Sequence, residues 1–289
     1  MKSAVQRFRM VLLCAVLWAF CFVGVAQGFK RDVSKLGVPL RWYRFPVSFV
    51  LDQNGIGQHF KNFPDYGAPG SEEQALLNSF QTWLNATCDG KAVGFSAQYG
   101  GRAVGKSIGF NRDNASQNTN LIVFRNAKGD WKHDNLRVAV TTTTYNNSSG
   151  ELLDADMEIN AADPTLYFFA TKVVPNSQKK WWDLQTVITH EAGHFLGLGH
   201  SDLAKAVMYT QGTERSIEKR KLHADDSAGI CAIYPPKDAL SGIPTYNQTS
   251  GGRDLGCNAI YTSRSLHALY IGLIGLFLFL LFRRKRVNR

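Results

Sequence analysis

The interpretation of this sequence starts from residues 190–200, which read His190-Glu191-Ala192-Gly193-His194-Phe195-Leu196-Gly197-Leu198-Gly199-His200. Residues four apart on a helix lie on one face, so His190 and His194 can reach the same metal ion. Glu191 is turned by about 100° from His190, so it can lie beside the metal without ligating it. Gly197 accepts the left-handed backbone that ends a helix, and the resulting chain reversal can bring back His200 as a third ligand.

Three histidines and one carboxylate in this spacing predict a catalytic zinc site. Three neutral imidazoles leave the full charge on the metal and a fourth position open for water. Zinc lowers the pKa of bound water from about 15.7 to about 7, and Glu191 can take its proton as a general base and pass it to a leaving amine. A zinc that only stabilises the fold is the alternative. It is disfavoured because a structural site needs no base and usually has a fourth protein ligand.

With the residues around it, this motif resembles that of the metzincins, and of the matrixins among them. Met208 resembles the Met-turn below the zinc, and Ser201 follows the third histidine as in matrixins. Residues 222–230 resemble the matrixin C-terminal helix, whose paired acids, here Asp225 and Asp226, anchor the Met-turn and the mature N-terminus. Simple N-capping is the other role for these two acids. Residues 153–160 are similar to the last strand of bacterial matrixin-like proteins.

The resemblance implies an α/β metzincin fold, with a twisted five-stranded mixed sheet, a long active-site helix and a short C-terminal helix. It implies that a protein or peptide substrate lies along an edge strand, expected at residues 139–144. Residues 209–221 would form the specificity loop, whose charges we interpret as solvated rather than as selecting substrates. Neither a Pro-Arg-Cys-Gly cysteine switch nor a second, structural zinc is expected, since His133 is the only histidine in the region where that zinc would bind.

Residue patterns predict the main elements and one acidic strand face. The predicted strands are residues 46–51, 93–99, 120–124, 137–145 and 151–160, and the predicted helices are residues 71–83, 181–196 and 225–234. Ser71 is the candidate N-cap of the first helix. Asp154, Asp156 and Glu158 share one face of the last strand. Calcium takes oxygen ligands and could bind there, but a solvated sheet face is the favoured interpretation.

Both ends of the chain carry targeting signals, and these account for most of the net charge of +10. Residues 1–26 have a basic start, an apolar run and small residues before a cleavage point, which predicts a secretory signal peptide. The body between the ends is nearly neutral, so nucleic acid is not an expected partner. We predict a catalytic domain over residues 27–236, a Gly- and Ser-rich linker over residues 237–257, and a transmembrane or sorting segment over residues 258–289.

The C-terminal segment has an apolar run over residues 266–282, followed directly by four basic residues at 283–286. Seventeen residues are at the low end of what crosses a bilayer, and the basic cluster predicts a cytoplasmic end. Together with Cys257 after Gly256, the segment resembles the MYXO-CTERM type of bacterial sorting tail, which implies attachment at the cell surface through the cysteine. A permanent single-pass anchor is the alternative.

Two cysteines remain in the predicted body, Cys88 and Cys231. Export to an oxidising compartment favours a disulfide between them over two free thiols. The sequence therefore predicts an exported, surface-tethered zinc endopeptidase of unknown oligomeric state. The rivals are a zinc-bearing adhesion module without turnover and an enzyme of the same fold that acts on a non-peptide amide. The natural substrate cannot be predicted from the sequence.

Overall fold

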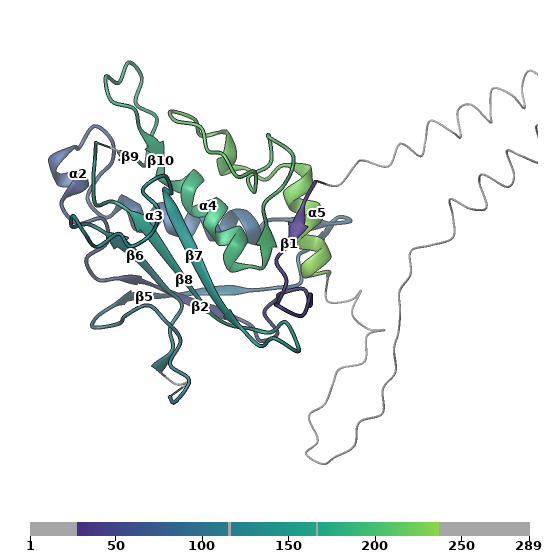
Figure 1. Ribbon diagram of the computed structural model, residues 1–289. Coiled ribbons are helices and arrows are strands. Elements are labelled where there is room, and N and C mark those ends of the chain that lie inside the picture. Colours follow the sequence, from purple (N-terminus) through teal and green to yellow (C-terminus); the bar gives the residue numbers. More distant parts are fainter. Residues whose placement is uncertain (1–27, 115–116, 166, 237–289) are drawn as a thin grey trace, which may run out of the picture. The chain divides into compact units, whose positions relative to one another are not determined.

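The computed structural model describes residues 28–114, 117–165 and 167–236 (Figure 1). The predicted signal peptide, the predicted linker and the predicted C-terminal segment lie outside these residues. Within the described residues, no helix combines the length and the apolar character needed to span a membrane. The apolar run over residues 266–282, on which the transmembrane prediction depends, lies outside the described residues.

A five-stranded mixed sheet organises the described part of the chain, with the strand order β5-β2-β6-β8-β7. The first four strands in that order are parallel, and β7 runs antiparallel to β8 and forms one edge. This confirms the predicted metzincin sheet. The strands are β2 (Val47–Asp52), β5 (Ala97–Ala103), β6 (Leu121–Arg125), β7 (Ala139–Tyr145) and β8 (Leu152–Asn160).

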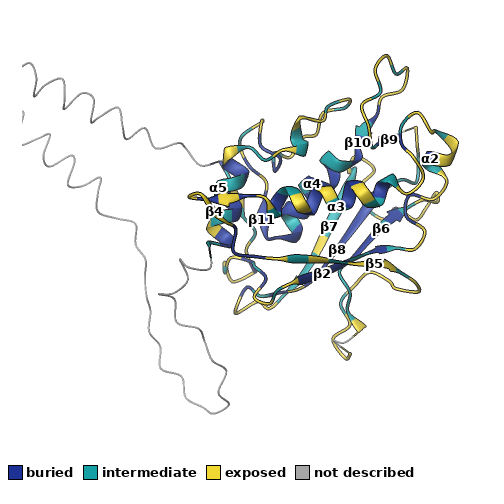
Figure 2. Cartoon of the chain, turned by 180° about the vertical axis from the view of Figure 1, so that it is seen from behind, coloured by how far each residue is buried: buried dark blue, intermediate teal, exposed yellow. Residues whose placement is uncertain are grey.

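Two long helices, α3 (Ser71–Leu84) and α4 (Leu184–Phe195), cover one face of the sheet (Figure 1). Their inward side chains meet Met157 and Ile159 of β8 in one continuous core. Phe49 of β2 stacks on Phe80 of α3 with ring centroids 3.8 Å apart. The central strands and α4 are largely buried, as the dark colour in Figure 2 shows. The metal-site helix is therefore held rigidly against the sheet.

Short elements complete the fold around these layers. The pairs are β1 (Lys30–Arg31) with β11 (Leu198–Gly199), β3 (Thr87–Cys88) with β4 (Lys91–Ala92), and parallel β9 (Phe169–Ala170) with β10 (Trp182–Asp183). The short helices are α2 (His59–Asn62), the 3₁₀ turn η2 (Glu218–Arg220) and the C-terminal α5 (Ala224–Ile233). The β1–β11 pair ties the start of the described chain to the segment that leads into His200.

Three predicted boundaries are wrong for identifiable reasons. β5 begins at Ala97 rather than at residue 93, because Gly94 N donates to Tyr234 O and residues 93–95 pack under α5 instead of joining the sheet. Gly70, in left-handed conformation, is the N-cap of α3, and the hydroxyl of Ser71 bonds to Thr171. α4 begins at Leu184 rather than at residue 181, because the preceding residues pair with β9 and the Asp183 carboxylate caps the helix.

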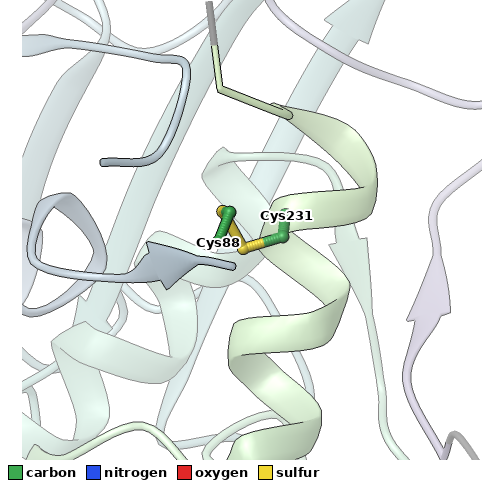
Figure 3. The surroundings of a disulfide bond; sticks show 2 residues. All are labelled: Cys88 and Cys231. Carbon is green, nitrogen blue, oxygen red and sulfur yellow. A yellow bond between two sulfur atoms is a disulfide. The ribbon is translucent and has the colours of Figure 1, made fainter. Parts of the chain in front are cut away.

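A disulfide joins Cys88 of β3 to Cys231 of α5 (Figure 3). The two residues are 143 positions apart, so the bond closes most of the described chain into one loop. Cross-links of this kind stabilise mainly by restricting the unfolded chain, by about 2–5 kcal/mol. The bond fastens α5 to β3, the short strand that follows α3.

The acidic face of β8 is not solvated, so the favoured sequence interpretation of this face is wrong. Asp154, Asp156 and Glu158 are only 2%, 3% and 4% exposed. Asp156 accepts hydrogen bonds from the backbone N–H groups of Gly109 and Leu121, while Glu158 bonds to Arg125 and His133. The covering segments come from distant parts of the chain, and alternation along β8 alone could not reveal them.

Candidate metal centre and substrate cleft

Three histidine side chains meet where the sequence motif predicts a metal site. His190 and His194 lie on the C-terminal half of α4, and His200 follows β11. One ligand atom of each lies within 4.8 Å of the others, and the Nε2 atoms of His194 and His200 are 3.2 Å apart. Nδ1 of His190 donates to Val207 O and Nδ1 of His194 donates to Leu198 O, both at 2.8 Å. Their Nε2 lone pairs are therefore free to face a common point.

This arrangement fits zinc. Two nitrogen ligands at 2.0–2.1 Å from a tetrahedral zinc lie about 3.3 Å from each other, close to the separation of the two Nε2 atoms of His194 and His200. When neither Nε2 carries a proton, as in metal ligands, the two lone pairs repel at this distance unless a cation lies between them. The carbonyl groups that hold Nδ1 fix the imidazole tautomer and orientation, as they do in established metal sites. The residues present therefore form a three-histidine set suited to one zinc ion.

Burial favours neutral imidazoles at His190 and His200, and nearby carboxylates favour a positive charge among the three rings. Burial, reinforced by the nearby His194, lowers the pKa of His190 to about 3. Burial also lowers the pKa of His200. For His194, burial acts in the same direction, but the carboxylates of Asp32 and Glu191 outweigh it and raise the pKa above its ordinary value. Those two carboxylates would equally attract a metal cation held by the three rings.

Glu191 is buried beside the histidines, and its carboxylate is held by a side chain from the sheet. Its Oε2 accepts a hydrogen bond of 2.7 Å from the Thr141 hydroxyl on β7. Burial raises the pKa of Glu191 above its ordinary value, against the opposing effects of His194 and Thr141. A carboxylate with a raised pKa binds a proton more strongly, which suits a general base that must act near neutral pH.

The chain reversal after α4 depends on Gly197. Its φ is +93°, a left-handed conformation, and a Cβ at this position would lie 2.6 Å from the carbonyl oxygen of Leu40. Any other residue would therefore be strained in its backbone and would collide with a neighbour. The reversal leads through β11 to His200, as the sequence pattern predicts.

Met208 lies below the histidines in a tight turn that the C-terminal helix holds in place. Its sulfur would collide with a Cβ on Gly193, so this glycine near the C-terminal end of α4 permits the close packing. The Asp226 carboxylate accepts hydrogen bonds from the N–H groups of Val207 and Met208. It also accepts one from His223 N, which closes a capping box at the start of α5. Asp226 thus serves the Met-turn and the helix cap together, while the N-cap residue itself is His223.

Asp225 binds the other end of the described chain. Its Oδ1 accepts hydrogen bonds from the N–H groups of Gly28 and Phe29, at 2.7 and 3.0 Å. Its Oδ2 accepts one from the Ser201 hydroxyl, next to the third histidine. The two adjacent acids therefore connect the N-terminal segment, the Met-turn and the histidine loop through buried hydrogen bonds.

A cleft of about 870 Å³ opens above the histidines. The free edge of β7 and the segment before it form one wall, and the first turns of α4 with residues 209–212 form the other. The residues that line the cleft include Thr141, Thr186, Val187, Glu191, Tyr209 and Lys219. An extended chain that enters the cleft would pass directly over the histidines.

Comparison with known proteins identifies the family. A family model described as matrixin matches residues 68–235, which is more than half of the chain. The chain belongs to the matrixin family. This match spans α3, the sheet from β3 onward, all three histidines and α5, so the fold and the matrixin assignment agree.

Several matrixin relatives are named as metalloproteinases. Metalloendoproteinase 1-MMP of Arabidopsis thaliana is 38% identical over 102 residues, covering 34% of this chain and 27% of its own. Human matrix metalloproteinase-20 is 31% identical over 244 residues, covering 76% of this chain and 46% of its own. Rat matrilysin is 44% identical over 54 residues, with coverages of 19% and 20%. This matrixin thus matches less than half the length of each of these relatives.

Sequence reasoning missed three parts of this matrixin site. Thr141, which binds Glu191, comes from a strand 50 residues away, and Asp32 approaches His194 from the N-terminal segment. Asp183 pairs with Arg220, which joins the start of α4 to the loop below the cleft. None of these contacts has a local sequence signal, because each depends on how distant segments fold together.

Proposed function

We propose that this matrixin is an exported zinc endopeptidase that hydrolyses peptide bonds in protein or peptide substrates. The observation that carries the proposal is a buried carboxylate, Glu191, beside three converging histidines in an open cleft. A merely structural zinc would not require a base next to its ligands or a cleft leading to them. The relatives named as metalloendoproteinases support the same conclusion.

The roles of the residues follow from their positions. His190, His194 and His200 would hold zinc, which when bound acidifies a water molecule and polarises a carbonyl group. Glu191 takes a proton from the attacking water and delivers it to the amine that leaves. Thr141 keeps the Glu191 carboxylate in one orientation through its 2.7 Å hydrogen bond. Met208 and Asp226 hold the floor of the site, so the histidines need not move during the reaction.

The substrate chain is expected to extend the sheet. β7 is the last strand in the sheet order, and its residues Ala139, Val140, Thr141 and Thr143 line the cleft. An extended peptide can pair with the free backbone groups of such an edge, which gives affinity without requiring a particular sequence. This mode of binding favours a polypeptide substrate over a small amide.

Activity of a matched pair of variants tests the proposal. Glu191→Gln should retain zinc, measured by elemental analysis, and lose about 10²- to 10⁴-fold in kcat/KM on an unfolded protein substrate. Glu151→Gln is the control, since Glu151 pairs only loosely with an exposed arginine at 3.7 Å. Equal activity of the Glu191 variant and the control, or no cleavage by a zinc-loaded wild type, would overturn the proposal.

We further propose that the enzyme is bacterial and acts at the cell surface, with residues 1–26 removed on export and residues 258–289 serving as the sorting segment. Gly256-Cys257, the apolar run and the basic cluster support this proposal. Mass spectrometry of surface protein should find Cys257 modified and the residues after it absent. Recovery of a peptide that ends at Arg289 would contradict processing and would favour a permanent anchor instead.

A further inference from the structure

We infer that Lys219 and Thr186 make the cleft select a substrate with an acidic side chain, Asp or Glu, next to the scissile bond. This inference rests on the proposed endopeptidase function and adds the substrate class to it. Lys219 belongs to η2 and lines the cleft that contains the histidines. Its charge therefore faces the space that a bound peptide would occupy.

The ammonium group of Lys219 has hydrogen-bonding capacity left for a ligand. It donates to the carbonyl oxygen of Gln211 at 3.0 Å and lies 5.2 Å from the centre of the Tyr209 ring. An ammonium group has three donors, so this hydrogen bond leaves two. In the part of the chain that the structure describes, no carboxylate lies within ion-pair distance of Lys219. The neighbouring Arg220, by contrast, forms an ion pair with Asp183.

The backbone beside Lys219 is fixed against α4. The Asp183 carboxylate accepts from Arg220 Nε at 2.9 Å and also from Thr186 N at 2.8 Å. A second nitrogen of Arg220 donates to Thr171 O. One carboxylate thus holds both the residue next to Lys219 and the backbone of Thr186. These contacts anchor the segment that carries Lys219 to α4. The Lys219 ammonium group is therefore held at the cleft.

Thr186 provides a second hydrogen-bond donor that lines the same cleft. It lines the cleft, and its hydroxyl oxygen is buried without a hydrogen-bond partner among the described residues. A buried hydroxyl without a partner is costly, so such groups are nearly always paired. Rotation of the Thr186 side chain would turn this hydroxyl toward the cleft, where a substrate carboxylate bound by the Lys219 ammonium could accept from it.

The environment of Lys219 strengthens the preference for an anion. Burial lowers the pKa of Lys219, against the opposing effect of the Asp226 carboxylate. An acidic substrate side chain would supply a counter-charge at ion-pair distance. The nearby Val187 and Trp182 make an apolar side chain the competing occupant, and the test below separates the two.

Paired peptides test this inference. Two quenched fluorescent peptides would differ only at the residues that flank one cleavable bond, Glu in one and Leu in the other. We expect wild type to prefer the Glu peptide in kcat/KM by about tenfold to a hundredfold, the usual strength of a charge-assisted contact. Lys219→Met should abolish this ratio, Lys219→Glu should invert it, and Thr186→Val should reduce it severalfold. Lys221→Met, an exposed residue two positions along, should leave the ratio as in wild type.

Binding of the same peptides to Glu191→Gln, followed by fluorescence anisotropy, separates this inference from the proposed function. Tighter binding of the Glu peptide, lost in a Lys219→Met background, supports the inference even if no peptide is cleaved. Cleavage or binding with equal or greater preference for Leu, unchanged by Lys219→Met, overturns the inference and leaves the endopeptidase proposal intact. The inference would also be overturned if the preference for the Glu peptide fell as much in Lys221→Met as in Lys219→Met.

Discussion

Two groups of buried carboxylates differ in how they are paired. Asp225 and Asp226, next to the Met-turn, together accept five backbone N–H bonds and one hydroxyl bond. On β8, three acids share fewer donors, and Asp154 faces the carboxylate of Asp156. The first group fixes the backbone of the proposed catalytic centre, and the second carries negative charge in excess of its partners. Both groups are buried, but they are expected to differ in their effects. Asp225 and Asp226 should affect catalysis, whereas the acids of β8 should affect stability and its pH dependence.

The largest effect on stability is expected at Glu158. Glu158→Gln leaves Arg125 without its 2.6 Å partner in a mostly buried setting. Breaking a buried ion pair from one side usually costs 3–5 kcal/mol, and the partial exposure of Arg125 reduces this to about 2–3 kcal/mol. Chemical denaturation measures the free energy of unfolding, while kcat/KM well below the melting temperature should stay near wild type. A large loss of kcat/KM in folded Glu158→Gln would show that the acids of β8 also affect catalysis.

A somewhat smaller loss of stability, this time together with a loss of activity, is expected at Asp226. Asn at this position would replace one carboxylate oxygen with an N–H donor that faces backbone N–H groups. We expect Asp226→Asn to lose about 2 kcal/mol of stability and about tenfold in kcat/KM, because the Met-turn loses its anchor. The exposed Asp202→Asn serves as a control. Full activity with only lower stability would limit Asp226 to a structural role.

A catalytic effect without a stability effect is expected at Thr141. Thr141→Val keeps the shape of the side chain and removes the 2.7 Å hydrogen bond to Glu191. kcat should fall by about threefold to tenfold with KM nearly constant, since the hydrogen bond orients the base rather than the substrate. Thr141→Ser, which keeps the hydroxyl, should restore most of kcat. An unchanged pH profile and an unchanged kcat in Thr141→Val would show that Thr141 does not position Glu191 for catalysis.

The smallest effect concerns pH and the Asp154–Asp156 pair. Burial and the neighbouring Asp156 raise the pKa of Asp154 to about 7, from an ordinary value near 3.8. The protonated form therefore stabilises the folded state below about pH 4, and this stabilisation is lost as the pH rises through about 7. Asp154→Asn should be less sensitive to pH, with the gap in melting temperature between pH 5 and pH 8 reduced by at least about 2 °C. An equal gap in melting temperature between pH 5 and pH 8 in wild type and Asp154→Asn would contradict the raised pKa of Asp154.

Much of the helix side of this molecule could be predicted from sequence, because its chemistry is local. His190, His194 and Gly197 act through helical spacing and a helix end, and Asp226 contacts residues fewer than 20 positions away. The acidic strand face could not be predicted correctly, since the segments around residues 109, 125 and 133 that cover it are remote in sequence. The positions of Thr141 and Lys219 also required the folded chain. Local patterns thus located the candidate metal site, Met208 and the two acids of α5, but not the contacts of Thr141, Asp32 and Lys219.

A zinc titration tests the central claim most directly. Wild-type protein stripped of metal would receive zinc in known amounts, and the rate of peptide cleavage would be followed together with bound zinc. The three-histidine site predicts that activity rises in proportion to bound zinc up to one ion per chain, and that His200→Ala abolishes this rise. Full cleavage before any zinc is added, or an unchanged titration in His200→Ala, would contradict the account.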